Sequence, residues 1–99
     1  MKNTKILFFY SHYNPVSLNS KIVLSKALDK VSSSLKMSFK FIDVLTDPEL
    51  CKKYCVSGVP TTLILSNESI VTRLLGEFEE NEILLLIEQL RKNKTEEKK

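Results

Sequence analysis

The sequence predicts a single α/β domain in which one mixed sheet of four strands carries helices on both faces. Three observations predict this class. Apolar runs of strand length alternate with segments whose apolar residues recur at helical spacing. Glycine, proline and small polar residues mark the boundaries between these segments. The element order is βαβαββα, so the first two strands, joined through a helix, run parallel, and the last two, joined by a short turn, run antiparallel.

The first half of the chain provides a central strand, a long helix and a second strand. The run Thr4–Tyr10 is almost wholly apolar, which is typical of a strand buried on both faces. Residues 15–33 form the first helix, because leucines recur at helical spacing and lysines occupy the other side. Residues 37–44 form the second strand, which alternates apolar and polar residues before it becomes continuously apolar.

The second half begins with a short helix in the stretch TDPELCKKY. Asp47 suits the N-cap of this helix, Pro48 suits its first position, and Glu49 favours the positive end of the helix dipole. A break at SGVP, residues 57–60, precedes a hairpin and a closing helix. We expect the remaining elements at residues 61–65 and 70–74 for the two strands, 66–69 for the turn and 81–90 for the helix.

The composition is that of a globular protein of one domain, with 99 residues, 42% of them hydrophobic and 27% charged. No apolar run approaches the roughly 20 residues that a membrane span needs. No signal peptide is visible, and two cysteines are too few for a secreted disulfide scaffold. The sequence therefore predicts a cytoplasmic protein that does not bind membranes.

The net charge of +3 comes from the end of the chain. The stretch RKNKTEEKK, residues 91–99, holds five basic and two acidic residues, so residues 1–90 carry equal numbers of each. We therefore expect a domain at residues 1–90 and a polar, disordered tail at residues 91–99. A nucleic-acid-binding role requires a basic face with aromatic platforms, which this sequence does not indicate.

The stretch IDVLTDPELCKKYCVSGVPTTLIL, residues 42–65, resembles the second half of thioredoxins, and RLLGEF also has a thioredoxin counterpart. The resemblance places nearly the whole chain in the thioredoxin-like superfamily and implies its fold. In that family the proline of Val-Pro-Thr is cis and faces the active site. The resemblance therefore implies that Pro60 is a cis-proline beside a former active site.

The stretch YSHYNPVS, residues 10–17, resembles the strand, loop and Cys-Pro-x-Cys motif of glutaredoxins. Asn14 takes the position of the nucleophile and Ser17 that of the resolving cysteine. An alternative register places Tyr13 and Val16 on the two cysteine positions. The Pro-x-Ser after the first strand and the Ile-Asp-Val-Leu further on also resemble the KaiB family of circadian clock proteins, which leaves a KaiB-like regulatory role as an alternative.

Neither register supplies a cysteine, and thiol–disulfide exchange needs one thiolate to attack and a second thiol to resolve. The buried acid that helps proton transfer in thioredoxins is also missing, since its position holds Phe8 or Leu7. Dithiol oxidoreductase activity at this junction is therefore not expected. Asn14 and Pro15 are instead a favourable N-cap and first residue of a helix, which leaves backbone N–H groups free for a ligand.

We therefore expect a redox-inactive domain that binds a protein or an extended peptide through the former active-site face. The expected partner adds as a strand beside Pro60, and Tyr10 and Tyr13 form an aromatic rim. No cofactor or metal is expected, although the resemblance to glutaredoxins leaves glutathione open. The candidate binding residues are His12, Tyr13, Asn14, Pro15, Ser17, Val59 and Pro60.

The two cysteines carry the competing hypothesis, an atypical thiol oxidoreductase or a glutathione-binding protein that uses Cys55. Cys51 takes the place of a small core alanine in thioredoxins, so we expect it to be buried. Cys55 replaces the glycine that ends the family's helix, which implies an exposed thiol in a strained turn. Residues four apart on a helix hold their Cβ atoms about 5–6 Å apart, so we expect no Cys51–Cys55 disulfide.

Overall fold

A computed structural model of the protein describes residues 4–31 and 37–97. Seven elements follow one another in the predicted order. They are β1 (Thr4–Tyr10), α1 (Pro15–Val31), β2 (Met37–Asp43), α2 (Pro48–Lys53), β3 (Thr61–Ser66), β4 (Ser69–Leu75) and α3 (Glu80–Glu97).

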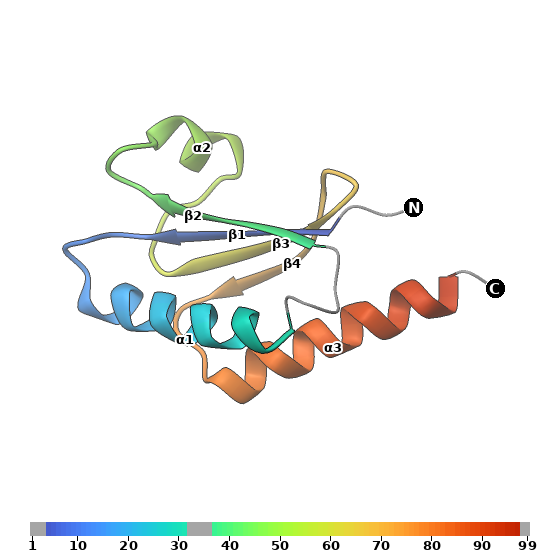
Figure 1. The fold of residues 1–99 in the computed structure, drawn as a ribbon. Coiled ribbons are helices and arrows are strands. Elements are labelled where there is room, and N and C mark those ends of the chain that lie inside the picture. The colour runs from blue at the N-terminus through green and yellow to red at the C-terminus, as the bar shows by residue number, and fades with distance from the viewer. Residues whose placement is uncertain (1–3, 32–36, 98–99) are drawn as a thin grey trace.

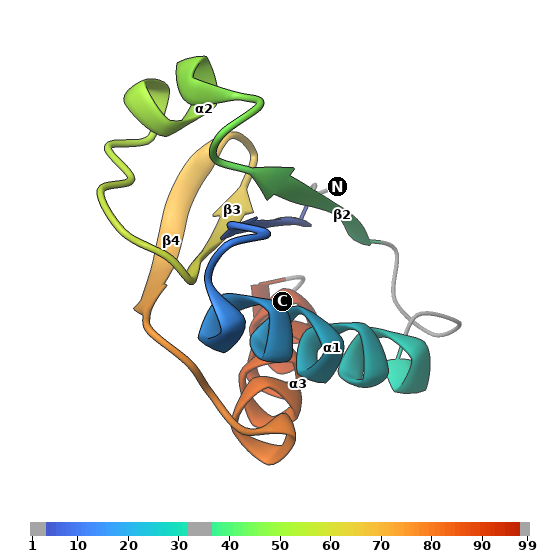
Figure 2. The same ribbon diagram turned by 90° about the vertical axis from the view of Figure 1, so that its left-hand side faces the viewer.

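The four strands form one mixed sheet in the order β2-β1-β3-β4. β1 pairs with β2 in parallel and with β3 antiparallel, and β3 pairs with β4 antiparallel. Helices α1 and α3 lie together on one face of the sheet, and the short helix α2 lies on the other (Figure 1). Figure 2, turned by 90°, shows the sheet between α2 on one side and the pair of α1 and α3 on the other. The predicted fold class is confirmed.

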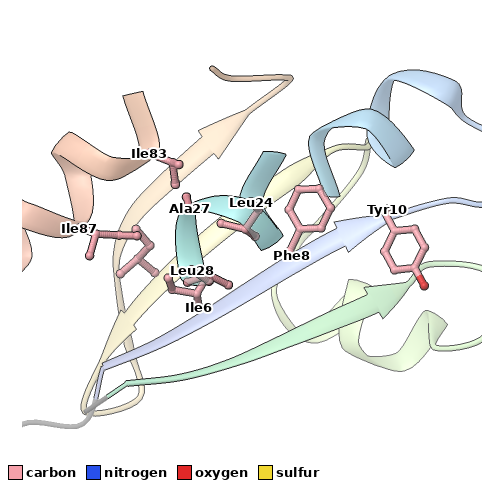
Figure 3. Packing of buried hydrophobic residues seen from close by; sticks show 9 residues of the cluster. Ile6, Phe8, Tyr10, Leu24, Ala27, Leu28, Ile83 and Ile87 are labelled. Carbon is pink, nitrogen blue, oxygen red and sulfur yellow. The ribbon is translucent and has the colours of Figure 1, made fainter. Parts of the chain in front are cut away.

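The central strand β1 is buried on both faces, as its apolar run predicts. Ile6, Phe8 and Tyr10 point toward α1 and α3, where they meet buried residues of both helices (Figure 3). Leu7 and Phe9 point the other way, toward α2. Because successive strand residues face opposite sides, a strand that is apolar throughout can contribute to two cores at once.

The larger core lies between the sheet and the two long helices. Phe8 is fully buried there, with edge-on ring contacts to Phe41 and Phe78. Such aromatic pairs add about 0.5–1.5 kcal/mol to the free energy gained from burial alone. The fully or nearly buried members of this core are Ile6, Phe8, Tyr10, Leu24, Ala27, Leu28, Ile64, Ile83 and Ile87.

The smaller core lies beneath α2, which has six residues, none of them fully buried. Asp47 stands at the N-cap of α2, but its side chain makes no capping hydrogen bond, which corrects the prediction. The backbone N–H of Asp47 instead donates to the carbonyl of Asp43 in a turn. So short a helix covers only part of its face of the sheet.

Several strand and helix boundaries differ from the predicted ones by one residue or more. The turn between β3 and β4 has two central residues, Asn67 and Glu68, both with positive φ, as a type I′ hairpin requires. The predicted end of the first helix lies outside the described residues. The polar sequence from Arg91 predicts a disordered tail, whereas α3 continues to Glu97. Glu, Lys and Arg favour helices and no Gly or Pro interrupts this stretch; the domain boundary at residue 90 stays a prediction.

Candidate functional site

The loop between β1 and α1 ends in a complete helix cap. The side-chain Oδ1 of Asn14 accepts a hydrogen bond of 2.7 Å from the backbone N–H of Ser17. The carbonyl of Asn14 accepts the first helical bond, from the N–H of Leu18. Pro15 follows at the first position of the helix, where its missing N–H removes no bond. The predicted N-cap is therefore confirmed.

The side chain of Ser17 stabilises this loop through hydrogen bonds to its backbone. Its side chain is fully buried, and its Oγ accepts a hydrogen bond of 3.1 Å from the backbone N–H of Ser11. The single hydroxyl proton of Ser17 has two acceptors within hydrogen-bond distance. They are the carbonyl of Asn14, 2.9 Å from Oγ, and the carbonyl of Ser11, 3.1 Å from Oγ. Position 17 therefore contributes hydrogen bonds that fix the loop, and it presents no atom to solvent.

The loop before β3 lies beside this helix start. The Val59–Pro60 peptide bond is cis, which is the isomer that the family resemblance implies, and Pro60 is buried. The hydroxyl of Thr61 donates to the carbonyl of Gly58 at 2.7 Å, and the N–H of Gly76 donates to the carbonyl of Pro60 at 2.9 Å. Both bonds hold the loop against the sheet.

A groove of about 420 Å³ runs between the two loops. Tyr13 and Asn14 form one wall, and Val59 lies on the other. The side chain of Tyr13 is 84% exposed, so its ring stands in solvent at the rim. The complete lining is Ser11, Tyr13, Asn14, Val44, Cys51, Val56, Ser57, Gly58 and Val59.

The other predicted binding residues do not line the groove. Ser17 and Pro60 are buried behind it, and Pro15 is exposed on the first turn of α1. Tyr10 is 7% exposed and packs in the larger core, so the expected aromatic rim consists of Tyr13 alone. The prediction for Tyr10 is wrong because the last residue of β1 still points toward α1.

His12 turns away from the groove toward the end of β2. Its Nδ1 lies 2.6 Å from Oδ2 of Asp43. The backbone N–H of Leu45 donates to the other oxygen of this carboxylate at 3.0 Å. The Leu45 N–H, the hydrogen bond with His12 and the charges of His12 and Lys21 together outweigh burial and lower the pKa of Asp43. The ammonium of Lys21 lies 4.2 Å from the centre of the Tyr10 ring.

Helix α2 ends in a Schellman motif on the far side of the groove. The N–H of Val56 donates to the carbonyl of Cys51 at 2.8 Å, and the N–H of Cys55 donates to that of Lys52 at 3.2 Å. Cys55 therefore occupies the left-handed position, with φ of 56°, that glycine usually fills. Its side chain is exposed, as predicted.

Cys51 belongs to the groove lining and also packs against the edge of the smaller core. It is half-buried, which corrects the expectation of full burial. Burial first, and then the negative charge of Asp47, raise the pKa of the Cys51 thiol, so the protonated form is favoured. Both cysteines are free thiols. In residues 4–31 and 37–97, no three His, Cys, Asp or Glu side chains gather closely enough to hold a metal ion.

The sequence did not reveal that Ser11, Ser57 and Gly58 line the groove, or that Asp43 is the partner of His12. The sequence did contain a signal for the pairing of His12 with Asp43. In a parallel pair the ends of β1 and β2 meet, and Tyr10 aligns with Asp43. A residue just after β1 therefore lies beside the acid that ends β2.

Within the described residues no helix is long and apolar enough to cross a membrane.

Comparison with known proteins places the chain in a family. No model of a known protein family matches it. The SPbeta prophage-derived thioredoxin-like protein YosR of Bacillus subtilis (strain 168) is 33% identical over 67 residues, which are 67% of this chain and 82% of YosR. This chain belongs to the thioredoxin-like family.

Solved thioredoxin structures show the same fold. Thioredoxin-2, a component of the malaria parasite protein secretion machinery, superposes with a TM-score of 0.81 over 89% of this chain and 84% of its own, at 17% identity. The germline-specific thioredoxin Deadhead of Drosophila melanogaster superposes with a TM-score of 0.77 over 89% of this chain and 81% of its own, at 23% identity.

Proposed function

We propose that this protein binds an extended peptide or protein segment in the groove between Asn14 and Val59, and that it does not exchange disulfides there. The observation that carries the proposal is the groove itself. It joins an exposed aromatic ring, a capped helix start and the loop that ends in Pro60. The bound segment would lie along that loop and rest on the ring of Tyr13.

The backbone of Val59 supports strand addition. In the part of the chain that the structure describes, no group forms a hydrogen bond with the N–H or the carbonyl of Val59. The residue is half-buried and belongs to the groove lining. An extended segment laid antiparallel or parallel to residues 58–60 would satisfy this donor and this acceptor, as in other cases of peptide recognition by main-chain pairing.

The chemistry at positions 14 and 17 supports the absence of exchange. Asn14 carries an amide that is already used as a helix cap, and it offers no nucleophile for sulfur. The hydroxyl of Ser17 is buried and makes hydrogen bonds with the backbone of the loop. Both side chains therefore act as structural parts of a binding face.

The surroundings of the cysteines favour binding over thiol chemistry. The raised pKa of Cys51 disfavours the thiolate that attacks disulfides. Cys55 is an exposed free thiol and forms no disulfide with Cys51, so the structure gives it no second thiol as a partner for exchange. We assign the role to the cytoplasm, where two free cysteines remain reduced.

A peptide selection tests this function. A display library of random twelve-residue peptides is selected on the native protein, and the recovered peptides are titrated against purified variants by isothermal calorimetry. The variant Tyr13→Ala should lose at least about tenfold in affinity, because an exposed aromatic ring at the rim is a typical energetic anchor. Leu85→Ala is the matched control, since Leu85 is exposed on α3 and lies outside the groove lining.

The result that contradicts the proposal is equally specific. Peptides that bind native protein and the Tyr13→Ala variant with equal affinity would place recognition elsewhere on the surface. A second measurement locates the bound peptide without any substitution. Amide chemical shifts on binding should change at residues 11–14 and 57–59, and an absence of change there would overturn the proposal.

A further inference from the structure

A second hollow, of about 480 Å³, lies on the α2 side of the sheet. It shares no lining residue with the groove described above. Four segments contribute to it: the start of β1, the middle of β2, the end of α2 and the turn between β3 and β4. Its lining is Lys5, Leu7, Ser38, Phe39, Lys40, Leu50, Lys53, Tyr54 and Glu68.

The hollow exists because α2 is too short to cover this face. Leu7 belongs to the smaller core beneath α2, and Lys40 aligns with Leu7 in the parallel pair of β1 and β2. Lys5 lies two residues before Leu7 and therefore points to the same face. Lys5 aligns with Ser38, so the two lysines are diagonal neighbours on the face that the helix no longer covers.

The lining of the hollow carries an excess of positive charge. Lys5, Lys40 and Lys53 make no ion pair with any carboxylate of residues 4–31 and 37–97. Lys53 lies against the ring of Tyr54, with its ammonium 5.3 Å from the ring centre. Glu68, in the β3–β4 turn, is the one acidic residue in the lining. Three ammonium groups against one carboxylate favour an anionic ligand.

The hollow opens onto a free strand edge. β2 is the outermost strand on its side of the sheet. The N–H of Val44 donates to the carbonyl of Tyr10, so backbone groups of alternate residues of β2 point toward β1. Those of Phe39 and Phe41 therefore point outward, away from β1. Phe39 is 46% exposed at this edge.

We infer that β2 and the adjoining hollow bind an acidic, extended polypeptide segment as an added strand. Main-chain groups of the segment pair with the outward groups of Phe39 and Phe41. Every second side chain of an added strand faces the α2 side, so a segment with acidic residues at alternate positions brings its carboxylates to Lys40 and its two neighbouring lysines. This surface is separate from the groove beside Val59 and does not depend on it.

Two other occupants fit less well. A second copy of this chain paired through β2 would bring the lysines of both edges together, and like charges across paired strands are unfavourable. A small anion would use the ammonium groups but would leave the outward N–H and carbonyl of Phe39 unpaired. An acidic polypeptide satisfies both features of the surface.

The test uses a synthetic probe peptide of seven residues that alternates Glu and Val, with blocked termini. Binding is followed by amide chemical shifts of the native protein and by calorimetry at low salt. We expect the shifts to change at residues 37–41 and 53–54. A matched peptide with Gln in place of Glu should bind at least about tenfold more weakly, and added salt should weaken the Glu peptide.

Charge variants provide opposite predictions. Lys40→Glu should weaken binding by about tenfold or more, because it replaces an attraction with a repulsion. Glu68→Gln should strengthen it by about twofold to threefold, because it removes the one opposing charge of the lining. Lys26→Glu, an exposed lysine of α1 outside the hollow, is the control and should leave the affinity unchanged.

A backbone variant tests strand addition separately from charge. Phe39→Pro removes the outward N–H, and proline is tolerated at a strand edge. Phe39→Thr loses the same ring but keeps the N–H. We expect the proline variant to bind at least about fivefold more weakly than the threonine variant. If circular dichroism shows that the proline variant is unfolded, hydrogen exchange of the Phe39 amide in native protein replaces it, with slower exchange expected on binding.

Several results would overturn the inference. Equal affinity for the Glu and Gln peptides would remove the role of the lysines. Displacement of the peptide by millimolar inorganic phosphate or by oligothymidylate of equal charge would indicate a general anion site. Dimerisation through β2, or shifts confined to residues 11–14 and 57–59, would assign the edge to another role while leaving the groove proposal intact.

Discussion

The imidazole Nδ1 of His12 lies 2.6 Å from Oδ2 of Asp43, and this contact ties the loop after β1 to the end of β2. The two residues are 31 positions apart in the sequence. Their meeting follows from the parallel register that aligns Tyr10 with Asp43. Because Tyr13 and Asn14 come directly after His12, the contact also helps to position one wall of the groove.

The lowered pKa of Asp43 makes stability depend on acid pH. The carboxylate form is favoured in the folded protein, first by the Leu45 N–H and then by His12. A pKa lower in the folded than in the unfolded chain gives stability that is present above the ordinary Asp value of about 3.9. That stability is lost as the pH falls below this value through the lowered pKa. Urea denaturation between pH 6 and pH 2.5, roughly spanning this range, should show the loss in native protein.

Two variants of the His12–Asp43 pair separate the causes of this acid dependence. Asp43→Asn should flatten the acid part of the stability profile, because the amide cannot titrate. His12→Gln should keep part of the dependence, since the Leu45 N–H still favours the carboxylate. An Asp43→Asn variant with the same acid dependence as native protein would show that other carboxylates cause it.

The cap at Asn14 predicts a measurable loss of stability on truncation. Asn14→Ala removes the acceptor of the Ser17 N–H and should lower the free energy of unfolding by about 1 kcal/mol. Asn14→Asp keeps an acceptor at the same place and should lose much less. Urea denaturation at pH 7 compares the two variants. It also tests whether α1 is capped at Asn14, since a cap at another residue would leave Asn14→Ala without effect.

The turn after α2 predicts that glycine at position 55 makes the protein more stable. Cys55 has φ of 56°, a conformation that costs a residue with a Cβ up to about 1 kcal/mol relative to glycine. Cys55→Gly should therefore raise the free energy of unfolding by several tenths to about 1 kcal/mol. Cys55→Ala, which keeps the Cβ, is the control and should bring no gain. A destabilised glycine variant would mean that the thiol makes contacts that outweigh the backbone effect.

The two thiols should differ in reactivity. Cys55 is exposed, whereas Cys51 is half-buried with a raised pKa. Alkylation of native protein at pH 7.5, read by mass spectrometry of peptides, should modify Cys55 faster than Cys51. The difference should disappear in denaturant. Faster modification of Cys51 in native protein would contradict the geometry described for the groove.

The fold was largely predictable because periodicity reports burial directly. The unbroken apolar run of β1 indicates a strand buried on both faces, and the alternation along β2 indicates a strand. The polar turn at Asn67 and Glu68 was visible as a turn, but its type depends on backbone angles that side-chain identity only biases. The end of α3 was missed because a polar sequence with good helix formers is compatible both with a helix and with a disordered tail.

The site was predictable only in part. Local rules gave the cap at Asn14, since capping depends on neighbours in the sequence. The groove depends on distant segments, so Ser57 and Gly58 could be placed there only by tertiary structure. Tyr10 was misassigned because β1 is apolar on both faces, so its sequence does not show that Tyr10 continues the face of Ile6 and Phe8 into the larger core. The pairing of His12 with Asp43 required the register of two strands.

Reduction of insulin disulfides tests the central claim most directly, because it asks for the chemistry that Asn14 and Ser17 cannot supply. With dithiothreitol present, native protein should precipitate insulin no faster than dithiothreitol alone. The double variant Asn14→Cys with Ser17→Cys should form a 14–17 disulfide and accelerate the reaction weakly, because buried Phe8 offers no acid for proton transfer. Acceleration by native protein would contradict the account, and its loss in Cys55→Ser would assign the activity to Cys55.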